Sequence, residues 1–521
     1  MTASDAATRF GSGRAVARIE DAALLAGRGR FVDNLVVAGQ ATVAFQRSPH
    51  AHAHIVAIDV EAARAMPGVL AVYTGADLVA AGLQPMPGNA GFKRADGVAA
   101  GPARHALAHE MARFVGEPVV AVVAESREAA RDAVDSVVVD YDEIAAVTDV
   151  VAATTAGAPT IVPEAPDNIA AEMRHGDAAA TEAAFARASV RIALDLVNQR
   201  VAPVSMEPRS IAATVDPKSG RLLVRISSQM PTGVAATIAG SLPGLAQSDV
   251  HVQVGDVGGG FGMKTGIYQE DLVVAHAARA LRRAVRWQAD RSEEFLSGSH
   301  GRDVVSRAEL ALDADGKALA LRVHSLANVG AYATPAGVAI QVLIGPWVST
   351  SIYDIATIDL HLKAVLTNTT PTGPYRGAGR PEAIYIVERL FDAAAREMKR
   401  DPAELRRRNM IRPAQMPYKN AIGQTYDSGA FEKILDQGLA LADWSGFAAR
   451  RAESEARGKL RGRGLATFLE WTSGNAFEEK VSIDVTPDGM IEIFSATQAM
   501  GQGIATSYAQ LAVDVFGVPI D

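Results

Sequence analysis

Residues 250–283 read VHVQVGDVGGGFGMKTGIYQEDLVVAHAARALRR and combine the signals of a strand, a loop and a helix. The first part of this stretch alternates apolar and polar residues as a strand does, and its last part has the pattern of a helix. Between the two, four glycines and one lysine fall within residues 258–265. A strand, glycine-rich backbone and a helix start together present free N–H groups that can bind an anion.

Two phosphate-binding patterns narrowly fail in this loop. A Walker A loop needs a glycine directly before its lysine, and here Met263 precedes Lys264. The dinucleotide fingerprint, counted from Gly258 and Gly260, also needs a glycine where Met263 stands. The alternative interpretation is a tight turn that lets backbone segments approach closely. This loop alone does not decide between a turn and a ligand site.

The same order of strand, glycine- or proline-rich loop and helix recurs elsewhere in the chain. The three other units span residues 221–242, 358–400 and 490–517. One such loop is usually a turn, whereas four at strand-to-helix junctions indicate amides that converge on a large ligand.

The four loops carry more hydrogen-bond donors than acceptors. They hold the cations Lys264, Arg376 and Arg380. They also hold the side-chain amides of Gln229 and Gln502. This composition predicts a ligand that is anionic and rich in oxygen atoms.

Composition narrows the classes of partner. At 521 residues and 48% hydrophobic, the chain can bury large cores and is expected to form two or three domains. A net charge of −8 argues against nucleic acid or a membrane surface as the main partner. The sequence has no apolar run of about 18 residues and no signal-peptide core at its start, so we expect a cytoplasmic protein.

The chain has no cysteine. Disulfides, thiolate zinc sites, a cysteine nucleophile and an iron–sulfur cluster held by this chain are therefore excluded. Any redox chemistry needs a metal held in another way, or an electron carrier on a partner.

The N-terminal part alternates strand and helix signals. Residues 117–126 form a buried-strand pattern, residues 127–137 a helical one and residues 137–144 another strand. Residues 151–168, rich in Ala, Thr and Pro without periodicity, are the best linker candidate. Residues 380–400 give the clearest helix, with Pro381 in its first turn. The expected class is α+β, built from several domains.

Taken together, the motifs resemble the large subunit of the molybdenum hydroxylases, the xanthine dehydrogenase and aldehyde oxidase family. The resemblance rests on the following segments: VGGGFGMK (257–264), PYRGAGRPEA (374–383), AMGQG (499–503) and NQRVAPVSMEPRS (198–210). The N-terminal segments GRGRFVDN (27–34), RSPHAHAHI (47–55) and RFVGEPVVAVVAESREAARDAV (113–134) are similar to the family's hammerhead domain. The motifs follow the family's order over nearly the whole chain.

The resemblance implies three domains. Residues 1–155 would form a hammerhead-like α/β domain, and residues 156–420 the first molybdopterin-binding α+β domain. Residues 421–521 would begin the second molybdopterin-binding domain, which is incomplete in this chain.

The resemblance also implies the cofactor and its contacts. The cofactor would be molybdopterin, in bacteria commonly the cytosine dinucleotide form, and its dithiolene, not a protein side chain, would hold the molybdenum. Gln229 would lie near an oxygen ligand of the metal, and the other implied contacts come from three loops. They are Gly260, Phe261 and Gly262; Tyr375, Arg376 and Gly377; and Gly501, Gln502 and Gly503.

The implied reaction is hydroxylation of an aldehyde or an aromatic N-heterocycle with oxygen from water. Electrons would pass to a 2Fe-2S subunit and an FAD subunit on other chains. Carbon monoxide dehydrogenases of the family carry a copper-binding cysteine where this chain has Gly377. Purine-oxidising members carry a glutamate where this chain has Thr265, which argues against xanthine.

The family's general-base glutamate has no counterpart that we can identify in this chain, so the catalytic residue stays unknown. We expect that the glutamate lies on a missing continuation or on a second chain that completes the large subunit. The alternative is a non-catalytic remnant that binds the cofactor or sister subunits without turnover.

Other titratable residues receive ordinary interpretations. His50, His52 and His54 can share one strand face, but a structural strand is favoured over a metal site. Glu470 lies in an apolar segment and is a candidate buried carboxylate.

Overall fold

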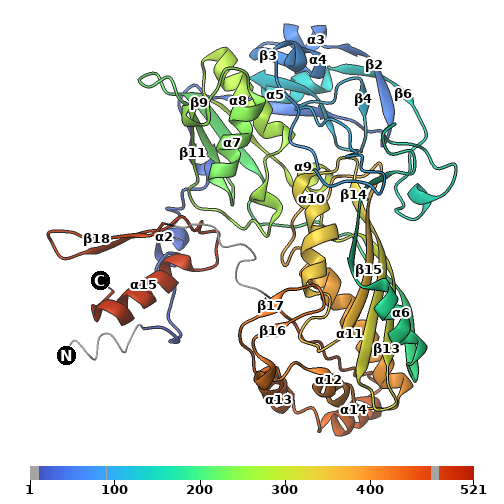
Figure 1. The fold of residues 1–521 in the computed structure, drawn as a ribbon. Helices are drawn as coiled ribbons and strands as arrows, with labels where there is room; N and C mark the ends of the chain where they lie inside the picture. The colour runs from blue at the N-terminus through green and yellow to red at the C-terminus, as the bar shows by residue number, and fades with distance from the viewer. Residues whose placement is uncertain (1–10, 90, 471–479, 521) are drawn as a thin grey trace.

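A computed structural model describes residues 11–89, 91–470 and 480–520 (Figure 1). The described residues form a seven-stranded sheet, a five-stranded sheet, a three-stranded sheet and two small hairpins. Among them, no helix has both the length and the apolar character that crossing a bilayer requires.

The seven-stranded sheet joins the N-terminal region to the segment that contains the glycine-rich loop. Its order is β11 (Val250–Gln253), β10 (Leu222–Ile226), β9 (Ser210–Val215), β12 (Val285–Gln288), β1 (Ala41–Arg47), β5 (Pro118–Ala124) and β3 (Val69–Thr74). Strands β1 and β12 pair in parallel, with Ala41 opposite Val285. The sheet thus runs continuously across the boundary predicted at residue 155, and the division into domains stays a prediction.

Helices cover this sheet where the sequence pattern places them. Helices α7 (Pro231–Ser241) and α8 (Gln269–Leu281) follow strands β10 and β11, and α5 (Arg127–Asp135) contacts β1 and β5. Strand β5 is buried along its whole length, in keeping with its run of apolar residues. The remaining N-terminal elements are α2 (Asp21–Leu25), α3 (Glu61–Ala65), α4 (Gly75–Ala80) and the sheet of β4 (Met111–Ala112), β2 (Ala53–Asp59) and β6 (Val138–Glu143).

The predicted linker, 151–168, is held firmly although it is mostly irregular. Apart from the short 3-10 turn Ala152–Thr154, it has no helix or strand. Its last residue, Asn168, is fully buried and donates to the carbonyls of Ala153 and Pro159 at 2.9 Å each. These bonds fold the segment back on itself, so it anchors the chain and is not a free tether.

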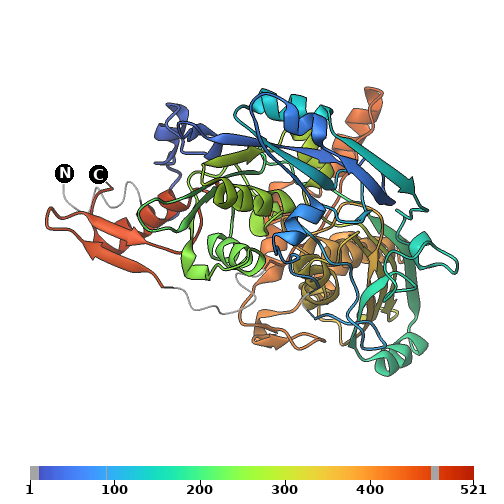
Figure 2. The same ribbon diagram turned by 90° about the horizontal axis from the view of Figure 1, so that it is seen from above.

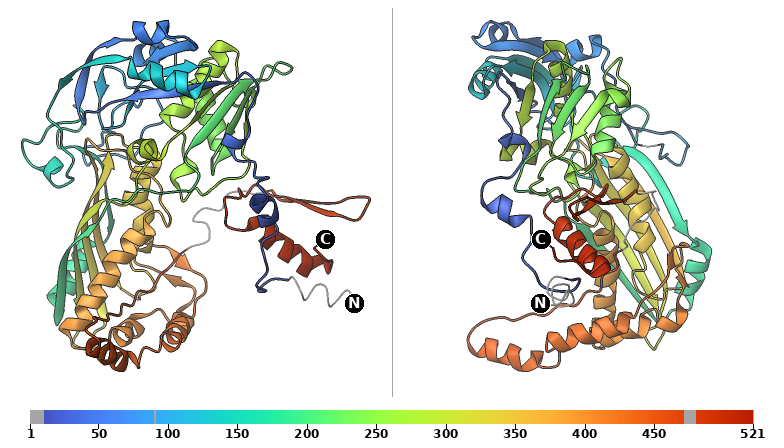
Figure 3. Two further views of the ribbon diagram at one scale, coloured as in Figure 1. Left: turned by 180° about the vertical axis from the view of Figure 1, so that it is seen from behind. Right: turned by 90° about the vertical axis from the view of Figure 1, so that its left-hand side faces the viewer.

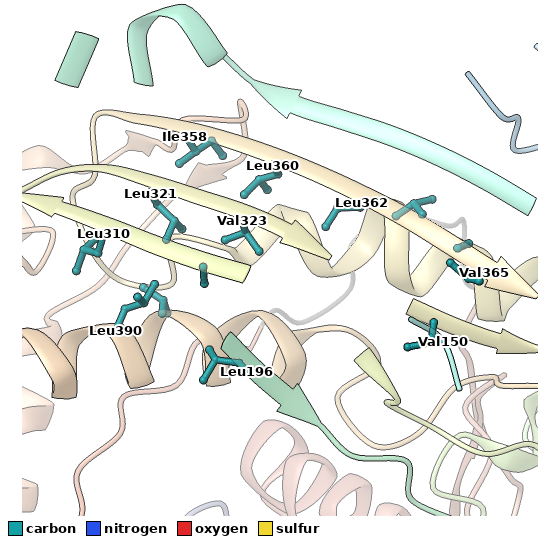
Figure 4. Close-up of a cluster of buried hydrophobic side chains, with 14 of the residues drawn as sticks. Val150, Leu196, Leu310, Leu321, Val323, Ile358, Leu360, Leu362, Val365 and Leu390 are labelled. Carbon is teal, nitrogen blue, oxygen red and sulfur yellow. The ribbon is translucent and has the colours of Figure 1, made fainter. Parts of the chain in front are cut away.

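The five-stranded sheet carries helices on its two faces. Its order is β7 (Ile169–Gly176), β15 (Thr357–Leu366), β14 (Ala318–Gly330), β13 (Val304–Leu312) and β8 (Val190–Asn198). Leu310 shares the main core with Leu390 of α11 (Arg380–Glu397), as Figure 4 shows. The next residue along the strand, Ala311, packs with Phe185 of α6 (Ala178–Ala186) on the other face, as the alternation of strand side chains requires.

Helix α11 begins near the middle of the molecule and runs outward along the sheet (Figure 3, left). Pro381 lies in its first turn, as the sequence predicted, and Ile384, Val387, Phe391 and Ala394 are buried. Beyond α11 the chain forms α12 (Pro402–Asn409), the hairpin β16–β17 (Tyr418–Lys419 and Thr425–Tyr426), α13 (Phe431–Leu441) and α14 (Phe447–Ala456).

The C-terminal unit, residues 480–520, contains hairpin β18–β19 (Ser482–Val485 and Ile491–Phe494) and helix α15 (Ile504–Phe516). Seen from above, it lies at one end of the molecule beside the N-terminal residues (Figure 2). The backbone of Ile19 donates to Thr506 Oγ1 at 3.0 Å, and Ser12 to Asp514 Oδ2 at 2.8 Å. All four predicted strand–loop–helix units are therefore present.

Candidate cofactor-binding site

The glycine-rich loop lies between β11 and α8 and adopts left-handed backbone at three residues. Gly259 and Gly262 have φ of +94° and +96°, which glycine adopts freely. Phe261 has φ of +52°, and its side chain is 42% exposed. Positive φ is costly for a bulky residue, and such strain is concentrated at functional sites.

Gln229 lies across this loop from the end of the neighbouring strand β10. Its backbone N–H donates to the Lys264 carbonyl at 2.9 Å, and its Oε1 accepts from the Gly262 N–H at 2.8 Å. A Cβ on Gly260 would stand 2.4 Å from Gln229 Oε1, so a glycine is required where the side chain crosses. The sequence placed Gln229 and Gly260–Gly262 at one site, and the structure brings them into direct contact.

Several donors at this contact have no protein acceptor. In the described part of the chain, the N–H groups of Gly260 and Phe261 and the Nε2 of Gln229 donate to no residue. Gly260 is buried, and a buried N–H without an acceptor is rare in folded proteins. These donors fit a ligand that brings oxygen atoms to the loop.

The loop before α11 lies against the glycine-rich loop. The Arg376 N–H donates to the Phe261 carbonyl at 2.9 Å, and a Cβ on Gly262 would stand 2.8 Å from the Pro374 carbonyl. Gly377 has φ of +94°. Tyr375, Arg376 and Gly377 therefore border the same place as Gly260–Gly262.

Arg302 holds this second loop, and sequence reasoning missed it. Its Nη1 donates to the Tyr375 carbonyl at 2.9 Å and its Nη2 to the Arg376 carbonyl at 2.7 Å. Its guanidinium carbon lies 4.8 Å from the centre of the Tyr375 ring, and its Nη1 pairs with Glu382 Oε1 at 3.3 Å. Arg302 lies more than 70 residues before the loop that it holds, so no local sequence pattern identified it.

The two arginines predicted on this loop differ in their surroundings. The side chain of Arg376 is exposed, and within residues 11–89, 91–470 and 480–520 it has no hydrogen bond or ion pair. Arg380 instead donates to the Gly377 carbonyl at 2.9 Å and pairs with Glu470 at 2.6 Å. Arg376 is thus available to an anionic ligand. Glu470 is 45% exposed at its side chain, which corrects the expectation of a buried carboxylate.

Lys264 does not face a ligand, contrary to the expectation for the cations of these loops. Its side chain is 1% exposed. Its Nζ donates to the Glu207 carbonyl at 2.7 Å and to Ser227 Oγ at 2.8 Å, and pairs with Glu207 Oε2 at 3.3 Å. Burial lowers the pKa of Lys264, and Glu207 offsets part of that effect. This lysine fastens the loop from beneath.

A buried ionic cluster supports the loop from the α8 side. Arg209 pairs with Glu294 at 3.0 Å and with Glu270 at 3.2 Å. Its guanidinium carbon lies 4.0 Å from the ring centre of Tyr268, whose hydroxyl donates to the Met263 carbonyl at 2.7 Å. Burial by itself raises the pKa of Glu270, but the charges of Arg209 and Arg47 outweigh it and lower that pKa to about 2.

The third predicted triplet, Gly501, Gln502 and Gly503, belongs to the C-terminal unit. The Gly501 carbonyl accepts from Arg18 Nη1 at 2.8 Å, and the Gln502 side chain bonds to Met500 and Gln498. Among the described residues, no hydrogen bond or ion pair joins 498–503 to the other two loops. The structure therefore brings Gln229, Gly260–Gly262 and Tyr375–Gly377 to one place, whereas the loop 498–503 is bonded to the N-terminal segment through Gly501 and Arg18.

A cavity of about 220 Å³ adjoins the connected loops. Met263 and Thr265 contribute from the glycine-rich loop, Pro374 from the loop before α11, and Arg104 from the N-terminal region. Thr334, which caps α10 (Pro335–Ala339), closes another side.

The histidines at positions 50 and 52 contact separate parts of the protein. His52 is buried and its Nδ1 lies 2.9 Å from the Ala145 carbonyl, whereas His50 pairs with Glu143 at 3.1 Å. Over the described ranges, no group of three His, Cys, Asp or Glu side chains is placed to hold a metal ion. These contacts support a structural role for residues 50–54.

Comparison with known proteins gives the same assignment over most of the chain. The model of the aldehyde oxidase and xanthine dehydrogenase a/b hammerhead domain matches residues 26–145. Models of the molybdopterin cofactor-binding domain match residues 161–410 and 437–521. The resemblance and the α+β class predicted from sequence are confirmed.

Two curated relatives show the extent of the match. The nicotine 6-hydroxylase large subunit of Paenarthrobacter nicotinovorans is 35% identical over 99% of this chain and 63% of its own length. The carbon monoxide dehydrogenase large chain of Hydrogenophaga pseudoflava is 35% identical over 96% of this chain and 64% of its own. The chain thus spans less than two thirds of the length of these relatives.

Solved structures share this fold. The reconstituted CO dehydrogenase from Oligotropha carboxidovorans has a TM-score of 0.91 at 30% identity, covering 100% of this chain and 67% of that one. Quinoline 2-oxidoreductase from Pseudomonas putida 86 has a TM-score of 0.87 at 33% identity, covering 98% and 65%.

Proposed function

The chain belongs to the molybdenum hydroxylases, the xanthine dehydrogenase and aldehyde oxidase family, and from that premise we propose its activity. It is the molybdopterin-binding large subunit of an oxidoreductase that hydroxylates an aldehyde or an aromatic N-heterocycle with oxygen from water. The observation that carries the proposal is the contact of Gln229 with the glycine-rich loop, where the buried N–H of Gly260 and the N–H of Phe261 have no acceptor among the described residues.

The residues at this contact fit an oxygen-rich cofactor that brings its own metal ligands. The backbone N–H groups of Gly260 and Phe261 and the Gln229 amide would donate to oxygen atoms near the metal. Arg376 would donate to a phosphate or to the pterin. The chain has no cysteine and no three-residue metal group among its described residues, so the pterin itself would hold the molybdenum.

The protein's own part in the reaction is positioning. When bound, the cofactor supplies the two-electron redox centre at which oxygen is transferred to a substrate carbon. Lys264, Arg302 and the Arg209 cluster fix the two loops, so that their donors need no reorganisation when the ligand binds. The general base stays unknown.

The finer cofactor and partner assignments follow from the same premise. We propose the cytosine dinucleotide form, with Gly501–Gly503 toward its pterin or phosphate. A 2Fe-2S cluster and FAD would lie on partner subunits, since this chain has no thiolate to hold a cluster. The relatives' own names, a large subunit and a large chain, support an assembly of several subunits.

Copper chemistry is not part of the proposal. A solved relative is described as a Cu,Mo-CO dehydrogenase. This chain has Gly377 at the place where the resemblance implies a copper-binding cysteine, and it has no cysteine elsewhere. Aldehyde or heterocycle oxidation is therefore favoured over oxidation of carbon monoxide.

Molybdenum content tests the proposal without an assay of turnover. The chain is purified with its partners from cells grown on molybdate, and molybdenum and released pterin are measured per chain. Arg376→Gln is expected to lower both roughly tenfold, because it removes a charge-assisted donor while leaving the fold intact. Gly260→Ala is expected to do the same, because its Cβ displaces the Gln229 side chain.

Arg408→Gln is the matched control. Arg408 is exposed and its side chain, like that of Arg376, has no bonding partner in the part of the chain that the structure describes. Its molybdenum content is expected to equal that of the wild type. Wild-type protein without molybdenum, or equal losses in all three variants, contradicts the proposal.

A further inference from the structure

The cavity beside the connected loops is mainly apolar and contains one cation. Met86 and Pro87 line it from the N-terminal region, and Met263 and Pro374 from the two loops. Among the residues that line it, Arg104 alone carries a charge. At about 220 Å³ it is smaller than pockets for drug-sized ligands, roughly 300–1,000 Å³, and suits a molecule with one ring.

Arg104 is fixed in place but has no anionic partner. Its carbonyl accepts from the Met86 N–H at 2.8 Å, and its Nε donates to Gln269 Oε1 at 3.3 Å. Its guanidinium carbon lies 5.7 Å from the ring centre of Tyr332. Within the described residues, neither Nη atom donates to an acceptor, and no carboxylate lies within ion-pair distance. The side chain is half-buried, where an unpaired charge is costly.

The hydroxyl groups around the cavity donate elsewhere. Thr265 Oγ1 donates to the Gly262 carbonyl at 2.7 Å, and Thr334 Oγ1 to the Thr372 carbonyl at 3.0 Å. The Tyr268 hydroxyl donates to the Met263 carbonyl at 2.7 Å. A ligand in the cavity therefore finds side-chain donors chiefly at the two Nη atoms of Arg104.

The planar guanidinium sets the chemistry of the ligand. Two parallel N–H groups match the two oxygens of a carboxylate, and they do so better when partly shielded from water. The apolar residues opposite Arg104 suit the ring or chain that carries that carboxylate.

We propose that this cavity receives the substrate and that Arg104 is a specificity-determining residue that binds a carboxylate on a one-ring aldehyde or heterocycle. The assignment of the cavity to the substrate rests on the proposed function. The same anion chemistry can come from a phosphate of the cofactor, and the experiment separates the two sources.

Calorimetric titration of the purified 521-residue chain at pH 7 and low salt tests the proposal, with benzoate and benzamide as probes of equal shape. Benzoate is expected to bind roughly 10- to 100-fold tighter, the range for a hydrogen-bonded charge pair. Arg104→Gln is expected to abolish this difference, and Arg104→Lys to reduce it, because lysine keeps the charge without the planar pair of donors. Arg408→Gln is the control and is expected to keep it.

Each contrary outcome is decisive. Equal binding of benzoate and benzamide by the wild type overturns the proposal, as does a preference that survives in Arg104→Gln. Should Arg104→Gln fail to fold by circular dichroism, Arg104→Lys carries the same comparison. Loss of cytidine monophosphate binding in Arg104→Gln, with benzoate binding unchanged, would assign Arg104 to the cofactor and overturn the substrate assignment.

Molybdenum content of the same variants, purified with their partners from cells grown on molybdate, separates this inference from the proposed function. Arg104→Gln is expected to retain the wild-type molybdenum content while it loses the benzoate preference. A chain that prefers benzoate through Arg104 but never contains molybdenum contradicts the proposed function alone. A chain that contains molybdenum but has no such preference contradicts this inference alone.

Discussion

Two glycine-rich loops of this molecule have the same local design and opposite surroundings. Residues 258–266 and 498–503 both connect a strand to a helix, and both contain left-handed glycines. The first is fastened by buried charges, Lys264 beneath it and Arg209 behind it. The second is held through the half-exposed Arg18 and its bond to the Gly501 carbonyl. A local pattern thus predicts a loop, whereas the surroundings decide how firmly it is fixed.

The largest expected effect comes from breaking the buried support of the first loop. Arg209→Met leaves Glu270 and Glu294 buried without their shared cation, which is expected to cost roughly 3–5 kcal/mol in the free energy of unfolding. Urea unfolding at pH 7 measures this loss. Arg307→Met, which breaks the exposed pair with Asp195, is the control and is expected to cost less than about 1 kcal/mol. Similar losses in the two variants would show that the cluster is not a special support.

A medium effect is expected in the pH dependence of stability, through the buried carboxyl of Asp271 in α8. Burial raises the pKa of Asp271 to about 7, although the hydrogen bond from the Tyr268 N–H by itself lowers that pKa. The folded state therefore holds a proton that the unfolded state releases near pH 4, so this group's contribution to stability falls as pH rises from 4 to 7.

Asp271→Asn is expected to remove that fall. The difference in free energy of unfolding between variant and wild type should therefore favour the variant by roughly 1 to 3 kcal/mol more at pH 8 than at pH 5. Unfolding curves at the two pH values measure it. Glu270→Gln is the opposite control, because a pKa lowered to about 2 gives stability that is lost only as pH falls below about 4.5. A variant Asp271→Asn with the wild-type pH slope would rule out the raised pKa.

The smallest expected effect lies at the second loop. Arg18→Ala removes the bond to the Gly501 carbonyl and is expected to cost less than about 1 kcal/mol, because the side chain is 45% exposed. Hydrogen exchange of residues 498–510 is expected to rise while exchange of residues 258–266 stays unchanged. Arg28→Ala, also exposed, is the control without such a contact. Faster exchange in both loops would mean that they are held as one unit.

Much of the fold and part of the site can be predicted from the sequence. The alternation of residues 250–253 and the helical pattern of residues 269–281 are local properties, and both elements form where expected. Gln229 and the Gly260–Gly262 loop were placed at one site through the family resemblance, and they touch. Arg302 and Arg209 were missed because their partners lie tens of residues away and no spacing rule links them.

The sequence by itself determined the strand–loop–helix units, the absence of thiolate ligands and the family, because these depend on residue type and short-range order. The folded structure was needed to show that Lys264 points into the protein and that Arg104 faces a cavity without an anionic partner. The physical reason is that the cost of a charge depends on what surrounds it, and those surroundings come from distant parts of the chain.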